Sequence, residues 1–271
     1  MNVDPYTSRS HLLNLESIAW DSIRKHPMPS EAVRALRYMQ DIECHTIVYV
    51  RELLATRAID DPEIAAFLAC WFYEESFHAR ALARFLVAAG HDPIARVRSR
   101  PSLARRLEER AIGIVSRIWP DFVAVHMTWG AINELTTLTG YQRLVELAGH
   151  PILTELLGRI VRDEARHFSF YYRQAEQRLV SERTRRVTRF LVDHFWAPVG
   201  SGVQPDEEVK FLASYLMSDT AGRAAARKVD ATIRRLPGFE HIRLLEAWID
   251  APATAAGRGF EICAERTSHG C

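Results

Sequence analysis

Hydrophobic positions recur every three or four residues along most of this chain, and glycine and proline fall mainly between the periodic segments. This period is typical of amphipathic α-helices, whereas the two-residue alternation that marks strands is scarce. Beyond residue 181 the periodic segments are shorter and more basic. The chain is therefore predicted to be all-α, with longer helices over these approximate ranges: 10–25, 30–57, 61–90, 103–118, 120–148 and 151–180.

Local signals mark the ends of several predicted helices. Ser30 is a good N-cap, and Asp61-Pro62-Glu63 combines an N-cap, a proline at the first helical position and an acid in the first turn. Gly149-His150-Pro151 ends one helix and begins the next. We expect one domain over residues 1–271, with a four-helix bundle over about 30–180 and accessory helices on its N-terminal and C-terminal sides.

Composition narrows the class of protein. The 271 residues are 48% hydrophobic and 25% charged, with a formal net charge of +1, which gives no general reason to expect nucleic acid as a partner. The N-terminus lacks the pattern of a secretory signal, and the longest apolar run, 64–73, is too short to span a bilayer. The four cysteines form no Cys-x-x-Cys pair. A cytoplasmic protein with reduced thiols, no membrane span and no bound nucleic acid is expected.

Two Glu-x-x-His tetrads carry the strongest chemical signal. One such tetrad means little, because a chain rich in Glu and His contains one by chance. Here each tetrad follows a helix with one well-placed glutamate, 32 residues earlier in the first case and 30 in the second. The repeated unit supplies six candidate metal ligands: Glu43, Glu75, His78, Glu134, Glu164 and His167.

The spacing within each tetrad puts its glutamate and histidine on one helix face, so that both can reach one metal ion. Four inward-facing helices would then supply four carboxylates and two imidazoles, the ligand set of a carboxylate-bridged di-iron bundle. Such a set suits iron or manganese better than thiolate-based zinc. Four buried glutamates would be very costly without compensating cations. Two iron ions are expected, and a manganese–iron pair fits the same ligands.

Acids beside the tetrads are candidates for a supporting role. Glu74 and Asp163 each precede a tetrad's glutamate, where a carboxylate can accept the N–H of a ligand histidine on another helix. A surface acid next to the site is an equally open interpretation of each.

Four further positions lie near the predicted ligands on the same helices. Tyr171 and Tyr141 are candidates for redox-active groups, although simple packing is the favoured interpretation. Thr137 would bring a hydroxyl to the side of the pocket where oxygen binds. Gly130, four residues before Glu134, would leave space on the same face.

With these residues assembled, the chain resembles the soluble acyl-carrier-protein fatty acid desaturase family, whose fold is a ferritin-like four-helix bundle. The segment from Trp71 to His78 resembles the family's Trp-x-x-Glu-Glu-x-x-His, and 163–167 resembles its Asp-Glu-x-x-His. Residues 134–137 match its Glu-x-x-Thr. The likeness covers about 30–180 and is closest to the compact actinobacterial branch. It departs from the plant type in length and in having Cys44 after the first glutamate.

The resemblance implies an O2-dependent di-iron enzyme that desaturates an acyl chain, with the six ligands binding iron and Thr137 assisting oxygen activation. Its motifs include Trp71, Glu74 and Asp163, which with Tyr171 are expected around the ligands, and it implies an acyl carrier protein or another acyl thioester as the substrate. A homodimer is also expected. The chain has no dinucleotide or iron–sulfur fingerprint, so electrons must come from outside, as from a ferredoxin.

An acidic carrier protein would require a basic docking face. Two arginine-rich stretches are candidates, although solvated helix surfaces explain such runs more often. The first comprises Arg96, Arg98, Arg100, Arg105, Arg106 and Arg110, and the second Arg183, Arg185, Arg186 and Arg189.

Three other functions remain open at this stage. The same site supports hydroxylation or N-oxygenation of another substrate, because one di-iron bundle hosts many oxidations. A non-enzymatic iron protein, for storage or peroxide scavenging, is a second alternative. A helical interaction protein without metal is the third.

Overall fold

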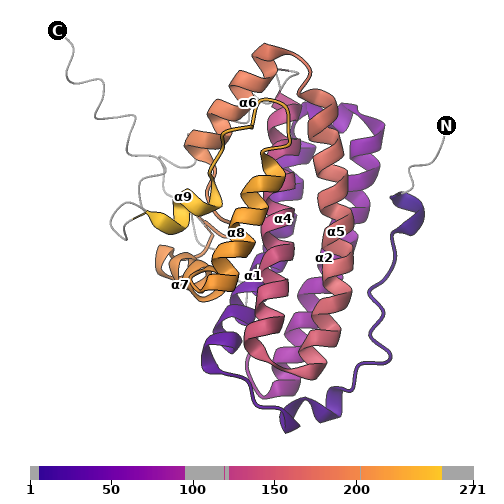
Figure 1. The fold of residues 1–271 in the computed structure, drawn as a ribbon. Helices are drawn as coiled ribbons and strands as arrows, with labels where there is room; N and C mark the ends of the chain where they lie inside the picture. The colour runs from indigo at the N-terminus through magenta and orange to yellow at the C-terminus, as the bar shows by residue number, and fades with distance from the viewer. Residues whose placement is uncertain (1–5, 95–118, 120–121, 202, 252–271) are drawn as a thin grey trace.

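The computed structural model describes residues 6–94, 119, 122–201 and 203–251 (Figure 1). These residues form helices and no strand, apart from an isolated bridge between Ser201 and Gln204. The all-α class expected from the hydrophobic period is confirmed. The predicted helix over 103–118 and the first arginine stretch lie outside the described residues.

Four long helices form the bundle. They are α1 (Ser30–Leu54), α2 (Pro62–Ala89), α4 (Phe122–Ala148) and α5 (Pro151–Arg178). Helix α1 packs along α2 and α4 along α5, while contacts of α1 with α4 and of α2 with α5 close the ring. Each bound agrees with the sequence prediction to within about three residues, the usual uncertainty at frayed helix ends. The predicted four-helix bundle is therefore present.

The predicted capping residues form the two ends of α2. The Asp61 carboxylate accepts hydrogen bonds from the backbone N–H groups of Glu63 (2.9 Å) and Ile64 (3.4 Å), which begins α2. At its other end Gly90 adopts φ +90°, a conformation that ends a helix at little cost only for glycine.

His150 begins α5 and also ties this helix to the N-terminal region. Its Nδ1 accepts a hydrogen bond from the Leu153 N–H at 3.1 Å, and its Nε2 lies 3.1 Å from the Ile23 carbonyl oxygen. This pairing makes Nε2 the protonated nitrogen of a neutral ring. Burial lowers the pKa of His150, in keeping with that neutral form.

The helix predicted over 10–25 is wrong. The structure has short 3-10 turns at Thr7–Arg9 and Trp20–Lys25, joined by a non-helical segment. This segment is held by tertiary contacts, since the Arg159 guanidinium hydrogen-bonds the Asn14 carbonyl and the Ser17 hydroxyl. The Asn14 side chain also accepts the Glu16 N–H, which competes with helical bonding. Long-range contacts have overridden a weak local helix preference.

The C-terminal part adds shorter helices, as predicted: α6 (Glu182–Phe195), α7 (Asp206–Met217), α8 (Thr220–Ile233) and α9 (Leu245–Asp250). They lie on the α1 and α4 side of the bundle, opposite the N-terminal segment (Figure 1). One hydrophobic core joins them to the bundle, including Leu216, Ile233 and Leu245. None of the described helices is long and apolar enough to cross a bilayer.

Candidate metal centre

All six predicted ligands converge in the interior of the bundle. Glu43 comes from α1, Glu134 from α4, and each tetrad contributes one glutamate and one histidine from α2 or α5. They form two groups, and within each group one candidate ligand atom per residue lies within 4.8 Å of the others. The first group is Glu43, Glu75, His78 and Glu164; the second is Glu75, Glu134, Glu164 and His167.

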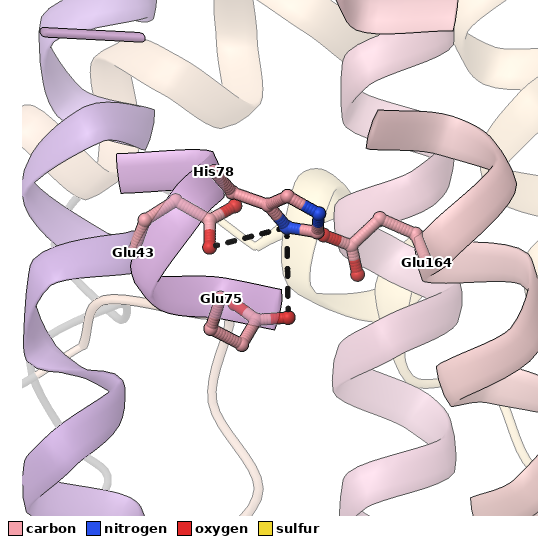
Figure 2. Close-up of side chains that lie close together, drawn as sticks. All are labelled: Glu43, Glu75, His78 and Glu164. Atoms are coloured by element: carbon pink, nitrogen blue, oxygen red, sulfur yellow. Dashed lines mark ion pairs between the residues drawn. The ribbon is translucent and has the colours of Figure 1, made fainter. Parts of the chain in front are cut away.

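In the first group three carboxylates surround one imidazole nitrogen. Nδ1 of His78 lies 3.4 Å from Glu164 Oε1, 3.8 Å from Glu75 Oε1 and 3.9 Å from Glu43 Oε2. Figure 2 shows the carboxyl groups of these glutamates grouped around the His78 ring. Three helices thus supply one candidate cation site.

The second group has the same form around His167. Its Nδ1 lies 3.0 Å from Glu75 Oε1, 3.4 Å from Glu164 Oε2 and 3.5 Å from Glu134 Oε2. Glu75 and Glu164 therefore belong to both groups, one from each tetrad. This sharing is the arrangement that two bridging carboxylates require between two metal ions.

Burial and unsatisfied polar atoms also indicate that the donor set can hold two cations. All six residues are buried, with 7% exposure or less. Several donor atoms make no hydrogen bond of ordinary geometry among the described residues, although buried polar atoms nearly always do. These unsatisfied atoms are Glu43 Oε2, Glu75 Oε1, His78 Nδ1, Glu164 Oε1 and His167 Nδ1. They face one another, as expected for atoms that bind ions held between them.

Burial and close approach shift the pKa values of the candidate ligands. Burial and the nearby Glu75 carboxylate raise the pKa of Glu43, and burial with the Glu164 carboxylate raises the pKa of Glu134. Burial alone would lower the pKa of His78, but the hydrogen bond to Asp163 and the nearby carboxylates of Glu164 and Glu75 raise it to about 10. The pKa of His167 is likewise raised, despite its burial, by the acidic groups around it.

Glu164 has the opposite shift. Burial would raise its pKa, but His167 and His78 on either side hold it well below the usual range. The two histidines therefore favour the anionic form of Glu164, whereas burial and neighbouring carboxylates favour the protonated forms of Glu43 and Glu134.

Metal uptake is consequently expected to release protons and to strengthen with rising pH. Ligands must be deprotonated to bind metal, and the pKa values of Glu43, Glu134, His78 and His167 are all raised. Between about pH 6 and pH 8, each displaced proton should increase the apparent affinity about tenfold per pH unit. Calorimetric titration with Mn(II) in buffers of different ionisation enthalpy measures this release. A pH-independent affinity without proton release would contradict the assignment.

Glu74 and Asp163 contact the histidines from the opposite helix, as their positions in the sequence indicated. Asp163 Oδ2 on α5 lies 3.1 Å from His78 Nε2, and Glu74 Oε2 on α2 lies 2.8 Å from His167 Nε2. These contacts turn Nδ1 of each ring toward the carboxylates and set its orientation. The His167 hydrogen bond lowers the pKa of Glu74 to about 2 despite burial. Both acids are buried, so the surface interpretation is wrong.

Two residues around these acids were missed by the sequence analysis. The Tyr6 hydroxyl donates to Glu74 Oε2 at 2.7 Å. Nη2 of Arg166 lies 3.0 Å from Glu74 Oε1 and 2.6 Å from Asp163 Oδ1, so it links both acids. Arg166 lies inside the second tetrad, so its position in the sequence could have indicated that it lies near the metal centre. Tyr6 offered none, because it is 68 residues from Glu74.

The two tyrosines near the ligands differ in their contacts. Tyr171 packs as expected, with its ring 5.7 Å from that of Trp71 in an edge arrangement. It also fills the space that Gly130 was expected to leave, since a Cβ there would clash with the Tyr171 ring. Tyr141 does more than pack, because its hydroxyl donates a hydrogen bond to Glu43 Oε1. Tyr141 is thus packed in the core as expected and also contacts a candidate ligand.

Thr137 lines a small apolar cavity that reaches the metal centre. The cavity has a volume of about 70 Å³ and lies between α1, α4 and α7, with Glu43 and Tyr141 on its wall. Most other lining residues are apolar: Met39, Ile42, Val209, Leu212, Leu216, Met217 and Leu245, among others. An apolar molecule bound here would lie beside the Glu43 side of the centre.

The second arginine stretch lies on α6 and its charges are partly compensated. Arg186 pairs with Glu182 at 3.5 Å and Arg189 with Asp193 at 3.3 Å, while Arg185 donates to the Leu179 carbonyl oxygen. These contacts are typical of a solvated helix face.

Comparisons with known proteins give no assignment. No family model, curated protein or solved structure matches the chain significantly.

Proposed function

We propose that this protein is an O2-dependent di-iron oxidoreductase that removes two hydrogens from adjacent carbons of an acyl chain. One observation carries the proposal: two buried groups of ligands share Glu75 and Glu164 and adjoin an apolar cavity. The motif resemblance to acyl-carrier-protein desaturases supplies the substrate class. The homodimer and the cytoplasmic location stay predictions.

The side chains of the centre have distinct proposed roles. Glu43, Glu75, His78, Glu134, Glu164 and His167 would hold two iron ions, and a manganese–iron pair would suit the same donors. A reduced pair of this kind supplies the capacity to activate O2. Asp163 and Glu74 keep the two imidazoles in place. Thr137 lines the cavity that Glu43 also lines, and Tyr141 holds the Glu43 carboxyl through its hydrogen bond.

The lining and the volume of the cavity indicate what kind of substrate it can hold. Its apolar wall suits methylene groups and offers few charged anchors, which supports a hydrocarbon substrate. Its volume of about 70 Å³ holds only a few atoms, so a long acyl chain would fit only if the walls of the cavity moved apart. The small volume favours one alternative, hydroxylation or N-oxygenation of a small apolar substrate at the same centre.

A single assay separates these reactions. Iron-loaded protein is incubated with reduced ferredoxin, O2 and a panel of acyl carrier proteins, acyl thioesters and small apolar substrates, and products are read by mass spectrometry. Loss of two hydrogens supports desaturation, and gain of one oxygen atom supports the alternative. Glu75→Ala is the negative control. No change in any substrate mass would argue against both enzymes and revive a non-enzymatic iron protein.

Filling the cavity should block turnover without removing metal. A Cβ at Gly140 on α4 would lie 3.2 Å from Met39 Cε and 3.5 Å from Leu216 Cδ1, so Gly140→Leu would occupy the cavity. We expect turnover to fall at least about tenfold, equivalent to about 1.4 kcal/mol in the barrier, at unchanged iron content.

Gly158→Leu on α5 is the matched control, because a Cβ at Gly158 would have no atom within 4 Å. Equal turnover in both variants would show that the substrate binds elsewhere.

A further inference from the structure

A second, basic pocket lies between the N-terminal segment and α5, on the face of the bundle opposite the C-terminal helices (Figure 1). Its volume of about 620 Å³ is within the range of small-molecule binding sites. Three arginines at intervals of three and four residues share the face of α5 that lines the pocket, and a fourth comes from the N-terminal segment. These arginines are Arg159, Arg162, Arg166 and Arg9. Among the described lining residues the only acid is Asp163, so positive charge is concentrated in one concavity.

Two of the four arginines are already paired within the protein. Arg159 contacts Glu155 and the N-terminal segment, and Arg166 contacts Glu74 and Asp163. These two side chains therefore build the wall and the floor of the pocket.

The other two arginines remain available to an external group. Arg9 and Arg162 are exposed and form no ion pair with any acid of the described residues. A cleft lined by charges of one sign concentrates counter-ions, and the guanidinium fork matches the geometry of a phosphate or carboxylate group. Arg9 and Arg162 are thus candidate ligands of an anion.

The rest of the lining indicates what kind of anion fits. A phosphate monoester carries about two negative charges at neutral pH, which equals the charge of the two available arginines. His11, Asn14 and Ser17 add polar groups that can bind hydroxyls, and Leu13 is the one aliphatic side chain among the described lining residues. Since this lining includes no Phe, Tyr or Trp, a nucleobase would find no ring to stack on. A hydroxyl-rich phosphate ester therefore suits the pocket best.

The floor of the pocket connects directly to the metal centre. The Arg166 side chain is 20% exposed and contacts both Asp163 and Glu74. Asp163 in turn contacts His78 at 3.1 Å, and Glu74 contacts His167 at 2.8 Å. Each ligand histidine is therefore one carboxylate away from a side chain that reaches the pocket surface.

The pocket and the apolar cavity approach the centre from different sides. The cavity lies between α1, α4 and α7, whereas the pocket lies over α5 and the N-terminal segment. A molecule bound in the pocket would leave the cavity open. Its effect on the centre would be transmitted through Arg166 and the two acids.

We propose that this pocket binds a soluble, hydroxyl-rich phosphate ester and that its occupancy is coupled to metal binding. The site goes beyond the proposed reaction, because anion binding itself requires neither iron nor O2. Arg9 and Arg162 bind the phosphate group, which places its negative charge in the pocket that Arg166 also lines. Negative charge there favours the positive charge that two divalent ions bring to the centre. By linkage, the metal ions strengthen anion binding by the same factor.

Calorimetric titration of the full, metal-free chain with glucose 6-phosphate tests the site. At about 0.15 M salt, where long-range attraction is screened, we expect one saturable site with a Kd below about 1 mM. Arg9→Gln combined with Arg162→Gln should lower the affinity at least about tenfold, because two charge-assisted contacts are lost. Arg162→Lys keeps the charge but not the fork, and it should lower the affinity at least about threefold.

The matched control removes two exposed cations on α8, Arg227→Gln with Lys228→Gln, which changes the net charge equally. Its affinity for glucose 6-phosphate should stay within about twofold of wild type, because exposed charges farther apart than about 8 Å are screened at this salt.

The coupling is tested with Mn(II)-loaded protein from which unbound metal has been removed by gel filtration. Its affinity for glucose 6-phosphate should exceed that of the metal-free chain at least about fivefold. Glu75→Ala, treated with Mn(II) in the same way, should bind the ester no more tightly than its untreated form, because Glu75 belongs to both ligand groups.

The possible outcomes separate the site, its ligand and the coupling. No saturable binding, unchanged affinity after removal of both arginines, or full affinity in Arg162→Lys overturns the site, the last because charge alone would then suffice. Binding only to vesicles that contain phosphatidic acid overturns the soluble ligand, because the phosphate would then belong to a lipid headgroup. Equal affinity with and without Mn(II) overturns the coupling. A chain that takes up no metal overturns the proposed function and the coupling, while the titration of the metal-free chain still decides the site.

Discussion

Glu75→Ala is expected to remove both metal ions, whereas Glu43→Ala or Glu134→Ala should remove only one. The reason is that Glu75 belongs to both ligand groups, while Glu43 and Glu134 each belong to one. Loss of a shared carboxylate leaves each site with three of its four donors and leaves the charge of both cations less compensated. Even supporting residues outside the ligand shell cost 10-fold to 100-fold in metal affinity, so we expect more than about 100-fold at both sites.

The measurement is metal content per chain after anaerobic loading with Fe(II) and gel filtration, supported by equilibrium titration with Mn(II). Circular dichroism confirms that each variant is folded. Glu164→Gln provides an independent check, because Glu164 is the other shared carboxylate and glutamine preserves its volume. Equal metal loss in all variants would contradict the two-group arrangement, and full occupancy of Glu75→Ala would contradict the site itself.

Metal loading is expected to raise the melting temperature of the protein by about 10 °C. A ligand that binds only the folded state stabilises it by about 4 kcal/mol at a free concentration 1,000 times its Kd. For a chain of this size, each kcal/mol corresponds to about 2–4 °C. The unsatisfied donor atoms of the centre are brought together only by the folded bundle, so the unfolded chain should bind metal far more weakly.

Differential scanning calorimetry with and without Mn(II) measures this shift, and a chelator should reverse it. Glu75→Ala is the control, and its melting temperature should not respond to metal. A shift of equal size in Glu75→Ala would mean that the metal stabilises the protein from another site. No shift in the wild type would argue that the centre binds no metal.

The sequence predicted most of the bundle because the signals that define its helices are local. Asp61 with Pro62 specifies a helix start, and Gly90 specifies a helix end, through groups within a few residues of one another. The ligands could also be predicted from short-range spacing, because the three-residue interval within each tetrad places its glutamate and histidine on one helix face. The intervals from Glu43 and Glu134 then placed all four helices around one centre.

The error over residues 10–25 has the opposite cause. This segment has some helical periodicity, but Arg159 and the Glu74 carboxylate hold it in a non-helical path along the bundle. Those contacts join residues more than 60 positions apart and leave no local pattern. The same distance explains why Tyr6 was missed as a partner of Glu74, and why the Tyr141 hydrogen bond to Glu43 was not foreseen.

The sequence by itself therefore determined the helix class, the six candidate ligands and the acids next to them, because helical periodicity makes these relations short-range. Only the tertiary structure decided that Glu75 and Glu164 are shared, which acid contacts which histidine, and that two pockets approach the centre from different sides. These properties depend on how the helices and the N-terminal segment pack together. Packing is set by the summed fit of many distant side chains, which no single stretch of sequence encodes.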